Sequence, residues 1–257
     1  MRTHVGIAGD RHLETLGNCG GFYSCPKSEG TGERLGPLVG YAGTYEGPDG
    51  KPFQFVGDIY ANFAKAEPHA HVLRFFAGCL AIILDVKVGI RKVDVLCGAP
   101  IGGYSLADAI GLENNIRMVK AEKQITAIRT LISREKSELV FSRHDIEKGD
   151  RCVIVEDVCN NFSTTGKFVR LIRSRGGIVV AILCFLNRSL EVENTFYLSL
   201  DGEADVLAIP VVSLVRLPIN EWRQDDPAVA DDVVRGNVVW KPKNEWDRLM
   251  QAMKANA

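Results

Sequence analysis

The stretch RCVIVEDVCNNFSTTGKFVRLIRSR, residues 151–175, decides the fold that we expect for this chain. Residues 152–155 are apolar and mostly β-branched, and they have the length of a buried parallel strand. Apolar residues then recur at helical spacing, at Phe168, Val169, Leu171 and Ile172. The stretch therefore predicts a strand, a polar loop and an amphipathic helix, with chemistry at the carboxyl end of the strand.

Two adjacent acids, Glu156 and Asp157, end the predicted strand. Open α/β sheets bind ligands at the carboxyl ends of their strands, where helix N-termini point into the crevice. Successive strand residues face opposite sides, so one acid can turn toward a sugar or a metal ion while the other turns toward the protein. Hydroxyls, backbone N–H groups and a glycine at a helix start suit a phosphate group. The candidate phosphate contacts are Ser163, Thr164, Thr165, Gly166 and Lys167.

The same residues allow an interpretation without a ligand, in which the acids end a solvated strand and the Ser-Thr-Thr segment is an ordinary helix N-cap. A second loop favours the ligand. In GAPIGG, residues 98–103, glycines follow another short apolar run and let the backbone approach a charged group closely. A generic glycine-rich turn is the alternative for this loop. Two such loops at two strand ends are more specific than either one alone.

The pattern of four apolar residues, two acids and a nearby Thr-Thr-Gly resembles the motif with which type I phosphoribosyltransferases bind 5-phosphoribosyl diphosphate (PRPP). The resemblance implies that Glu156 and Asp157 lie along the ribose hydroxyls and that the Thr-Thr-Gly loop holds the 5′-phosphate. The residues VCNNFS separate the acids from Thr-Thr-Gly, which is a longer spacing than the family has, so Asn160 and Asn161 are alternative phosphate contacts. The 98–103 loop becomes the pyrophosphate loop, and its implied PRPP contacts are Gly98, Ala99, Gly102 and Gly103.

Lys120 and Lys123, three apart after a predicted strand, resemble the lysines that open the mobile catalytic loop of orotate phosphoribosyltransferases. That loop closes over the diphosphate of the neighbouring subunit. The resemblance therefore implies a PRPP contact for Lys120, a catalytic role for Lys123 and a homodimer. The family's loop histidine is missing, because position 125 is Ile and His144 comes much later. A solvated charged hairpin is the alternative.

Arg188 follows another predicted buried strand, residues 178–186. In orotate phosphoribosyltransferases, which this chain resembles most, the arginine at this position holds the carboxylate of orotate, and it follows Asp rather than Asn. A guanidinium presents paired donors that fit a carboxylate, which a lysine does not reproduce. The alternative for Arg188 is a surface salt bridge.

Bulk properties narrow the class of protein. A formal net charge of −1 over 257 residues gives no general attraction to nucleic acid or to anionic membranes. The longest uncharged apolar runs, 75–84 and 176–186, are too short to span a bilayer. The 7 dispersed cysteines fit reduced thiols better than a disulfide framework. We therefore expect a cytoplasmic protein with no nucleic-acid or membrane partner.

The expected fold is an α/β domain with a mainly parallel sheet flanked by helices. The expected organisation is an N-terminal β-rich hood without a useful helix at 1–66, a PRPP-binding core at 67–216 and a C-terminal extension with a terminal helix at 217–257. A helix is expected to begin at Pro68.

The resemblance implies a Mg²⁺-dependent glycosyltransferase. It would transfer the phosphoribosyl group of PRPP to orotate, giving orotidine 5′-monophosphate and pyrophosphate in pyrimidine biosynthesis. Mg²⁺ would be held largely by substrate oxygens and water, with Asp157 as the candidate protein contact. The alternatives are a phosphoribosyltransferase for a purine or another base, and a non-catalytic PRPP-binding regulatory protein.

Overall fold

The computed structural model describes residues 10–47, 50–127, 136–200 and 206–255. The chain forms two compact units, one running from Glu67 to Pro218 and one combining Met1–Ala66 with Ile219–Ala257. Among the described helices, none is both long enough and apolar enough to cross a membrane.

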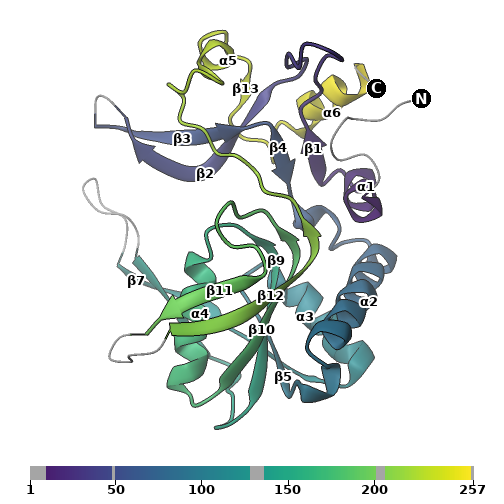
Figure 1. The fold of residues 1–257 in the computed structure, drawn as a ribbon, viewed down its shortest axis with the longest axis vertical. Coiled ribbons are helices and arrows are strands. Elements are labelled where there is room, and N and C mark those ends of the chain that lie inside the picture. Colours follow the sequence, from purple (N-terminus) through teal and green to yellow (C-terminus); the bar gives the residue numbers. More distant parts are fainter. Residues whose placement is uncertain (1–9, 48–49, 128–135, 201–205, 256–257) are drawn as a thin grey trace. The chain divides into compact units, whose positions relative to one another are not determined.

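The unit from Glu67 to Pro218 is built on a mainly parallel six-stranded sheet with the order β11-β12-β10-β9-β5-β6 (Figure 1). All neighbouring strands are parallel except β11 and β12. The predicted α/β fold with a mainly parallel sheet is therefore confirmed. The strands are β5 (Val95–Gly98), β6 (Arg117–Lys120), β9 (Arg151–Cys159), β10 (Ile178–Asn187), β11 (Thr195–Ser199) and β12 (Val206–Arg216).

Helices cover both faces of this sheet (Figure 1). On one face lie α2 (Ala70–Lys87) and α3 (Gly103–Asn114). Between these two helices the chain forms the 3₁₀ turn η2 (Ile90–Lys92) and β5. The ring of Phe76 packs against that of Phe185 of β10 with centroids 4.8 Å apart. The other face is covered by α4 (Ser163–Ser174), whose apolar stripe is fully buried at Phe168, Val169 and Ile172. Burying each such side chain contributes roughly 1.5–3 kcal/mol.

A two-stranded antiparallel hairpin, β7 (Glu122–Ala127) and β8 (Lys136–Val140), follows β6. Leu139 and Phe141 are buried against the core on the α4 side of the sheet. The charged segment that sequence places after residue 120 is thus a hairpin in its described part. The side chain of position 125 and residues 128–135 lie outside the described residues.

In the other unit, the C-terminal part of the chain completes a sheet begun by the N-terminal part. The sheet order is β13-β2-β3, and Val238 of β13 pairs in parallel with Leu38 of β2. A second, two-stranded sheet pairs β1 with β4. The elements are α1 (Arg11–Asn18), β1 (Phe22–Ser24), β2 (Leu38–Glu46), β3 (Pro52–Gly57), β4 (Ile59–Ala61), η1 (Phe63–Lys65), α5 (Ala230–Val234), β13 (Val238–Val239) and α6 (Trp246–Ala255).

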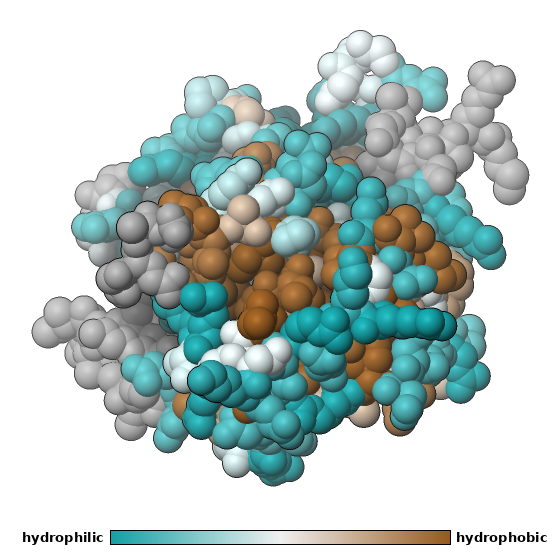
Figure 2. Space-filling model, turned by 60° about the horizontal axis from the view of Figure 1, so that its bottom comes forward, coloured by the Kyte–Doolittle hydropathy of each residue, from teal (hydrophilic) through white to brown (hydrophobic). Residues whose placement is uncertain are grey.

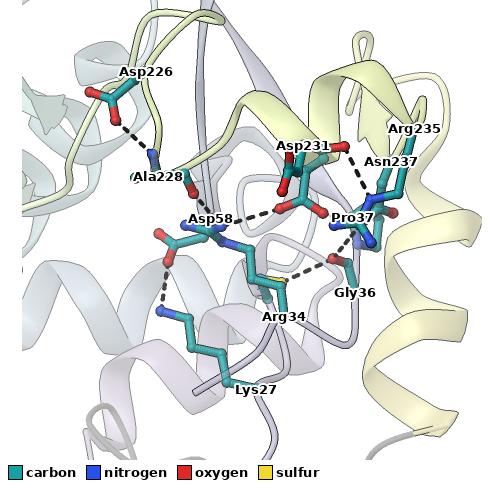
Figure 3. Close-up of polar contacts among 12 residues, drawn as sticks. Lys27, Arg34, Gly36, Pro37, Asp58, Asp226, Ala228, Asp231, Arg235 and Asn237 are labelled. Carbon is teal, nitrogen blue, oxygen red and sulfur yellow. Dashed lines mark hydrogen bonds and ion pairs between the residues drawn. The ribbon is translucent and has the colours of Figure 1, made fainter. Parts of the chain in front are cut away.

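Arg34 ties these two parts of the chain together (Figure 3). Its Nη1 donates to the carbonyl oxygen of Ala228 at 2.7 Å and to Oδ2 of Asp232 at 3.2 Å. Nearby, Lys27 pairs with Asp58 at 2.8 Å. Because the side chains of Arg34 and Asp232 are largely removed from water, their contact is stronger than an ordinary surface ion pair. Lys27 is about half exposed, so its pair with Asp58 contributes less.

A polar crevice of about 450 Å³ lies beside Arg34. The cations that border it already have protein acceptors, since Lys27 and Arg34 are ion-paired and Nε of Arg235 donates to the carbonyl oxygen of Asp231 at 3.1 Å. Basic and acidic side chains are equal in number along its walls. We therefore interpret this crevice as a solvent-filled surface feature beside the structural contacts of Arg34, and not as a ligand site. Its lining residues are Lys27, Gly32, Glu33, Arg34, Pro227, Ala228, Val229, Asp231, Asp232, Arg235 and Asn237.

Two expectations about local structure were wrong, and one strand was not foreseen. Residues Arg11–Asn18 form a helix where none was expected, because Asp10 caps the helix and Leu13 and Leu16 are buried. The helix expected at Pro68 begins at Ala70, with His69 as its N-cap. The antiparallel edge strand β11 was not foreseen, since its mixed polar and apolar residues lack the continuous apolar run of the inner strands.

Some apolar side chains remain exposed. Ile82 and Val86 stand one turn apart on α2, and Leu112 stands on α3. Figure 2 shows hydrophobic residues gathered near the middle of the face turned to the viewer, with polar residues around them. Scattered exposed apolar residues are normal, but clustered ones commonly mark contact surfaces.

Candidate functional site at the carboxyl ends of β5 and β9

The chain changes direction across the sheet between β5 and β9. From β5 it passes through α3 outward to β6, and from β9 it passes through α4 outward to β10 on the other side. Consequently α3 and α4 lie on opposite faces of the sheet (Figure 1). In open α/β sheets, such a reversal opens a crevice at the carboxyl ends of the two central strands, where ligands bind.

The glycine loop after β5 rests directly on β9. The N–H of Ala99 donates to the carbonyl oxygen of Val155 at 2.9 Å. A Cβ atom added to Gly102 would lie 2.2 Å from Cγ of Asp157, and one added to Gly103 would lie 2.0 Å from the carbonyl oxygen of Val155. Only glycine fits at position 103, because the atom it meets belongs to the backbone, and a side chain at position 102 would require the Asp157 carboxyl or the loop to move. The structure thus brings together the predicted pyrophosphate loop and the predicted acid pair.

The two acids occupy different environments, although they do not end the strand as expected. β9 continues to Cys159, because β10 extends alongside it and pairs Asn187 with Cys159. β5 ends earlier, at Gly98, opposite Val155. The acids therefore lie within β9 but just beyond the end of β5, where the glycine loop begins. As strand alternation predicts, Glu156 is buried while Asp157 is partly exposed.

Burial raises the pKa of Glu156 from its ordinary value of 4.5 to about 8, and the negative charge of Asp157 raises it further. The positive charge of Lys123 and a backbone N–H from Asp157 oppose this rise. Near neutral pH the carboxyl of Glu156 is therefore mostly protonated, since moving an ionised carboxylate out of water is unfavourable. The pair then presents one negative charge.

The predicted phosphate loop, residues 163–167, is not a loop. Ser163, Thr164, Thr165, Gly166 and Lys167 form the first turns of α4, which is preceded by Phe162 with a φ of 57°. The side-chain Oδ1 of Asn161 accepts a hydrogen bond from the Ser163 N–H at 3.1 Å. The helix starts early because Gly166 N–H already bonds the Phe162 carbonyl oxygen at 2.8 Å.

Only part of this segment can meet a ligand. Thr165 and Gly166 are buried, whereas Ser163, Thr164 and Lys167 reach solvent. The backbone N–H groups of a first helical turn have no partner within the helix and attract anions. The anion site, if occupied, would therefore be made by the start of α4 rather than by a free-standing Thr-Thr-Gly loop.

The two predicted loop lysines are placed differently. Lys120, at the end of β6, pairs with Asp108 of α3 at 2.5 Å and lies over the ring of Tyr104, 5.6 Å from its centroid. Lys123 lies on β7 with an exposed side chain, near enough to lower the pKa of Glu156. Lys123 is therefore grouped electrostatically with the acid pair, while Lys120 is held against α3.

Arg188 comes directly after β10, as expected, and its N–H donates to the carbonyl oxygen of Cys159 at 2.9 Å. Its side chain is partly exposed. The preceding Asn187 is fully buried, and its Nδ2 donates to the carbonyl oxygens of Val192 and Glu193, both at 2.9 Å. Arg188 thus stands at the carboxyl end of the strand next to β9, on a turn built by Asn187.

Sequence reasoning missed Asp108 and Arg216. Arg216 ends β12 and pairs in register with Asn187, so its guanidinium meets the turn that carries Arg188. A signal was available, because Arg216 follows a buried apolar run just as Arg188 does. Asp108 gave no comparable signal, since it sits inside an otherwise ordinary helix.

Within the described residues, no group of three or more His, Cys, Asp or Glu side chains is arranged to hold a metal ion. Asp157 is a partly exposed carboxylate beside a glycine loop. That donor set fits Mg²⁺, which commonly uses one or two carboxylates and takes its other ligands from substrate phosphates and water. The seven cysteines are all free thiols.

The unit from Glu67 to Pro218 is an α/β fold with a glycine loop, an acid pair and a helix start at the topological switch point of its sheet. Comparisons with known proteins indicate the class that it resembles. The chain is similar to phosphoribosyltransferases, and the resemblance inferred from its motifs is confirmed. No protein-family model matches the chain.

Among individual relatives, the chain is 27% identical over 169 residues to the orotate phosphoribosyltransferase of Caldanaerobacter subterraneus subsp. tengcongensis, covering 66% of this chain and 75% of that protein. It is also 23% identical over 163 residues to the transcriptional regulator GfcR of Methanocella arvoryzae, covering 62% of this chain and 73% of the regulator. The crystal structure of orotate phosphoribosyltransferase from Aeropyrum pernix aligns with a TM-score of 0.48 and 18% identity, covering 80% of this chain and 93% of that chain.

Proposed function

We propose that this protein is an orotate phosphoribosyltransferase. It transfers the phosphoribosyl group of PRPP to orotate, giving orotidine 5′-monophosphate and pyrophosphate. The observation that carries this proposal is the close approach of Gly102 to Asp157, 2.2 Å from an added Cβ to the carboxyl carbon. It brings a backbone suited to a diphosphate next to a carboxylate suited to a ribose.

In this reaction a ring nitrogen of orotate bonds to the anomeric carbon of PRPP as the bond to pyrophosphate breaks, and the proton of that nitrogen passes to the departing pyrophosphate or to water. Positive charge develops on the ribose ring while negative charge grows on the leaving group. Residues that stabilise both changes without moving lower the barrier. Asp157 lies where it would favour the cationic ring, and the backbone of the 98–103 loop would receive the pyrophosphate.

The raised pKa of Glu156 supports PRPP as the ligand. PRPP is a polyanion, and two ionised carboxylates beside it would repel it. Because Glu156 is largely protonated near pH 7, it can donate a hydrogen bond to a ribose hydroxyl while Asp157 alone carries charge. Lys123, which acts on Glu156, would contribute positive charge toward the leaving pyrophosphate.

At the other end of PRPP, the 5′-phosphate would bind at the start of α4. The exposed hydroxyl of Ser163, the hydroxyl of Thr164 and the first-turn N–H groups suit a phosphate. Anchoring this remote phosphate fixes the orientation of the anomeric carbon. The role of Lys120 as a PRPP contact requires release from Asp108, because the two are paired at 2.5 Å in this structure.

For the base, Arg188 would bind the orotate carboxylate through paired guanidinium donors. Mg²⁺, when bound, would neutralise charge on the diphosphate, and Asp157 is the residue that would hold it. We further propose a cytoplasmic homodimer, in line with the family resemblance, with no nucleic acid or membrane as partner.

The test is an assay of pyrophosphate release by the purified protein with PRPP, Mg²⁺ and one base at a time. We expect release with orotate and little with adenine, guanine, hypoxanthine or uracil. Release with a purine instead would replace orotate as the substrate and leave the class of reaction standing. Release with no base would contradict transferase activity.

A second candidate function is a PRPP-binding regulatory protein without turnover. The similarity to the transcriptional regulator GfcR favours it, as does Ile in place of the family's loop histidine at position 125. The two candidates differ in one result. A regulator would bind PRPP at the same strand ends and release no pyrophosphate with any base.

A further inference from the structure

The turn that carries Arg188 is built by a dense set of hydrogen bonds. Oδ1 of Asn187 accepts from the N–H of Ser189 at 3.1 Å, and its Nδ2 donates to two carbonyl oxygens further along the turn. Oγ of Ser189 accepts from the N–H groups of Glu191 and Val192 at 3.3 and 3.1 Å. Asn187 and Ser189 are both buried, so the segment 187–193 is organised from within.

Arg216 holds this turn from outside. Its Nη1 donates to the carbonyl oxygen of Asn187 at 3.1 Å, and its Nη2 donates to that of Ser189 at 2.5 Å. These two carbonyl groups flank Arg188 on either side. One planar guanidinium therefore fixes the backbone immediately before and immediately after the residue proposed to bind the base.

The rest of the Arg216 guanidinium makes no such contact. Its Nε is buried and has no hydrogen-bond partner among the described residues. A buried N–H without an acceptor is unfavourable. The Arg216 side chain nevertheless adopts this position, so its hydrogen bonds to the two carbonyl groups determine its orientation. A lysine has a single ammonium instead of a planar fork and would not span both carbonyl groups in this way.

We propose that Arg216 is a positioning residue, which orders the 187–193 turn and thereby sets Arg188 for the base. The second half of this statement rests on the proposed function, because it takes Arg188 as the base-binding residue. Arg216 itself touches no substrate in this account. Its effect reaches the base only through the two carbonyl groups.

The experiment compares Arg216→Met, Arg216→Lys and the control Arg235→Met with the wild type. Arg235 is a matched control because its Nε also donates to a backbone carbonyl, in the other unit of the chain. Hydrogen–deuterium exchange of the Ser189 and Val192 amides measures order in the turn. Michaelis constants for orotate and for PRPP measure its effect on the site.

For Arg216→Met we expect exchange in the turn about tenfold faster and a Michaelis constant for orotate about tenfold higher, as losing hydrogen bonds from a charged donor predicts. The constant for PRPP should stay within about twofold, because the PRPP contacts lie on other loops. Arg216→Lys should fall in between, which keeps the test decisive if the Met variant folds poorly. Arg235→Met should behave as wild type in both measurements.

Exchange at wild-type rates in both Arg216 variants would overturn the ordering of the turn. Faster exchange with equal changes in the constants for orotate and PRPP would overturn the link to Arg188. A wild-type protein that transfers to no base would instead contradict the proposed function, and the exchange rates would still decide whether Arg216 orders the turn.

Discussion

At the scale of single residues, the raised pKa of Glu156 makes the stability of the protein depend on pH. Its carboxyl is protonated in both folded and unfolded chains below about pH 4. As the pH rises from about 4.5 to 8, the unfolded chain releases the proton while the folded chain, with a pKa of about 8, keeps it. The free energy of unfolding therefore falls over this window, and the stabilisation present at low pH is lost above pH 8.

Glu156→Gln should remove this dependence. Between pH 4 and pH 9, we expect the free energy of unfolding of the wild type to fall by several kcal/mol, on the order of 4, relative to that of the variant. Urea unfolding followed by circular dichroism at several pH values measures it. Glu147→Gln, an exposed glutamate, is the matched control. Parallel pH profiles for wild type and Glu156→Gln would show that the buried carboxyl does not titrate as described.

Gly102 gives a second prediction at this scale. In Gly102→Ala the added methyl would enter the space of the Asp157 carboxyl, so either the loop or the acid must move. We expect PRPP-dependent pyrophosphate release to fall at least about tenfold, because small displacements of reacting groups are costly. Circular dichroism should remain close to that of the wild type.

Gly78→Ala is the control for this substitution. Gly78 lies within α2, where an added Cβ meets nothing within 4 Å. Alanine should leave activity unchanged there and stabilise the helix by roughly 0.5–1 kcal/mol. Full activity in Gly102→Ala would mean that the glycine loop and Asp157 need not meet for the reaction.

At the scale of elements, the N-cap residue Asp10 stabilises the short helix α1. Oδ1 of Asp10 accepts hydrogen bonds from the N–H groups of His12 and Leu13, at 2.9 and 3.4 Å. Asp10→Ala should therefore lower the free energy of unfolding by about 1 kcal/mol. Thermal or urea unfolding measures this, with Glu14→Ala, an exposed residue of the same helix, as the control. Equal losses in both variants would remove the capping role.

Sequence patterns foresaw the elements that are buried on long continuous faces. β9, α4 and β10 were expected because their apolar residues run without interruption or recur at helical spacing. α1 was missed because a helix of eight residues with two buried leucines is too short to show a recognisable helical repeat of apolar residues. The end of β9 was misplaced because pairing with β10, a tertiary contact, carries the strand past its acids.

In the candidate site, too, local sequence patterns predicted some features, while others depend on tertiary contacts. The glycine loop and the acid pair could be placed at neighbouring strand ends from sequence, because each follows a short apolar run and their residue types resemble a known motif. Strand alternation predicted that one of the two acids turns toward the protein, but not that this acid is Glu156. The pairing of Lys120 with Asp108 and the hydrogen bonds of Arg216 to the 187–193 turn could not be predicted. Each depends on which residues the sheet order brings together, which local sequence does not encode.

At the scale of the whole molecule, the two ends of the chain fold together. Residues 1–66 and 219–257 share a sheet through the pairing of β13 with β2. The expected hood and the expected extension therefore form one compact unit. The unit from Glu67 to Pro218 contains all of the site residues named above, from Gly98 to Arg188.

The proposed homodimer is a prediction at this scale. Light scattering after size-exclusion chromatography should give twice the chain mass of 28.2 kDa at micromolar concentration. The measurement should be made with and without PRPP. A mass of one chain under both conditions would contradict the dimer.

The central claim is that PRPP binds at the carboxyl ends of β5 and β9, through the glycine loop and Asp157. Calorimetric titration of wild type and Asp157→Asn with PRPP and Mg²⁺ tests it most directly. We predict one PRPP per chain in the wild type and an affinity at least about tenfold lower in Asp157→Asn. No binding to the wild type, or equal affinity in both proteins, would contradict the account.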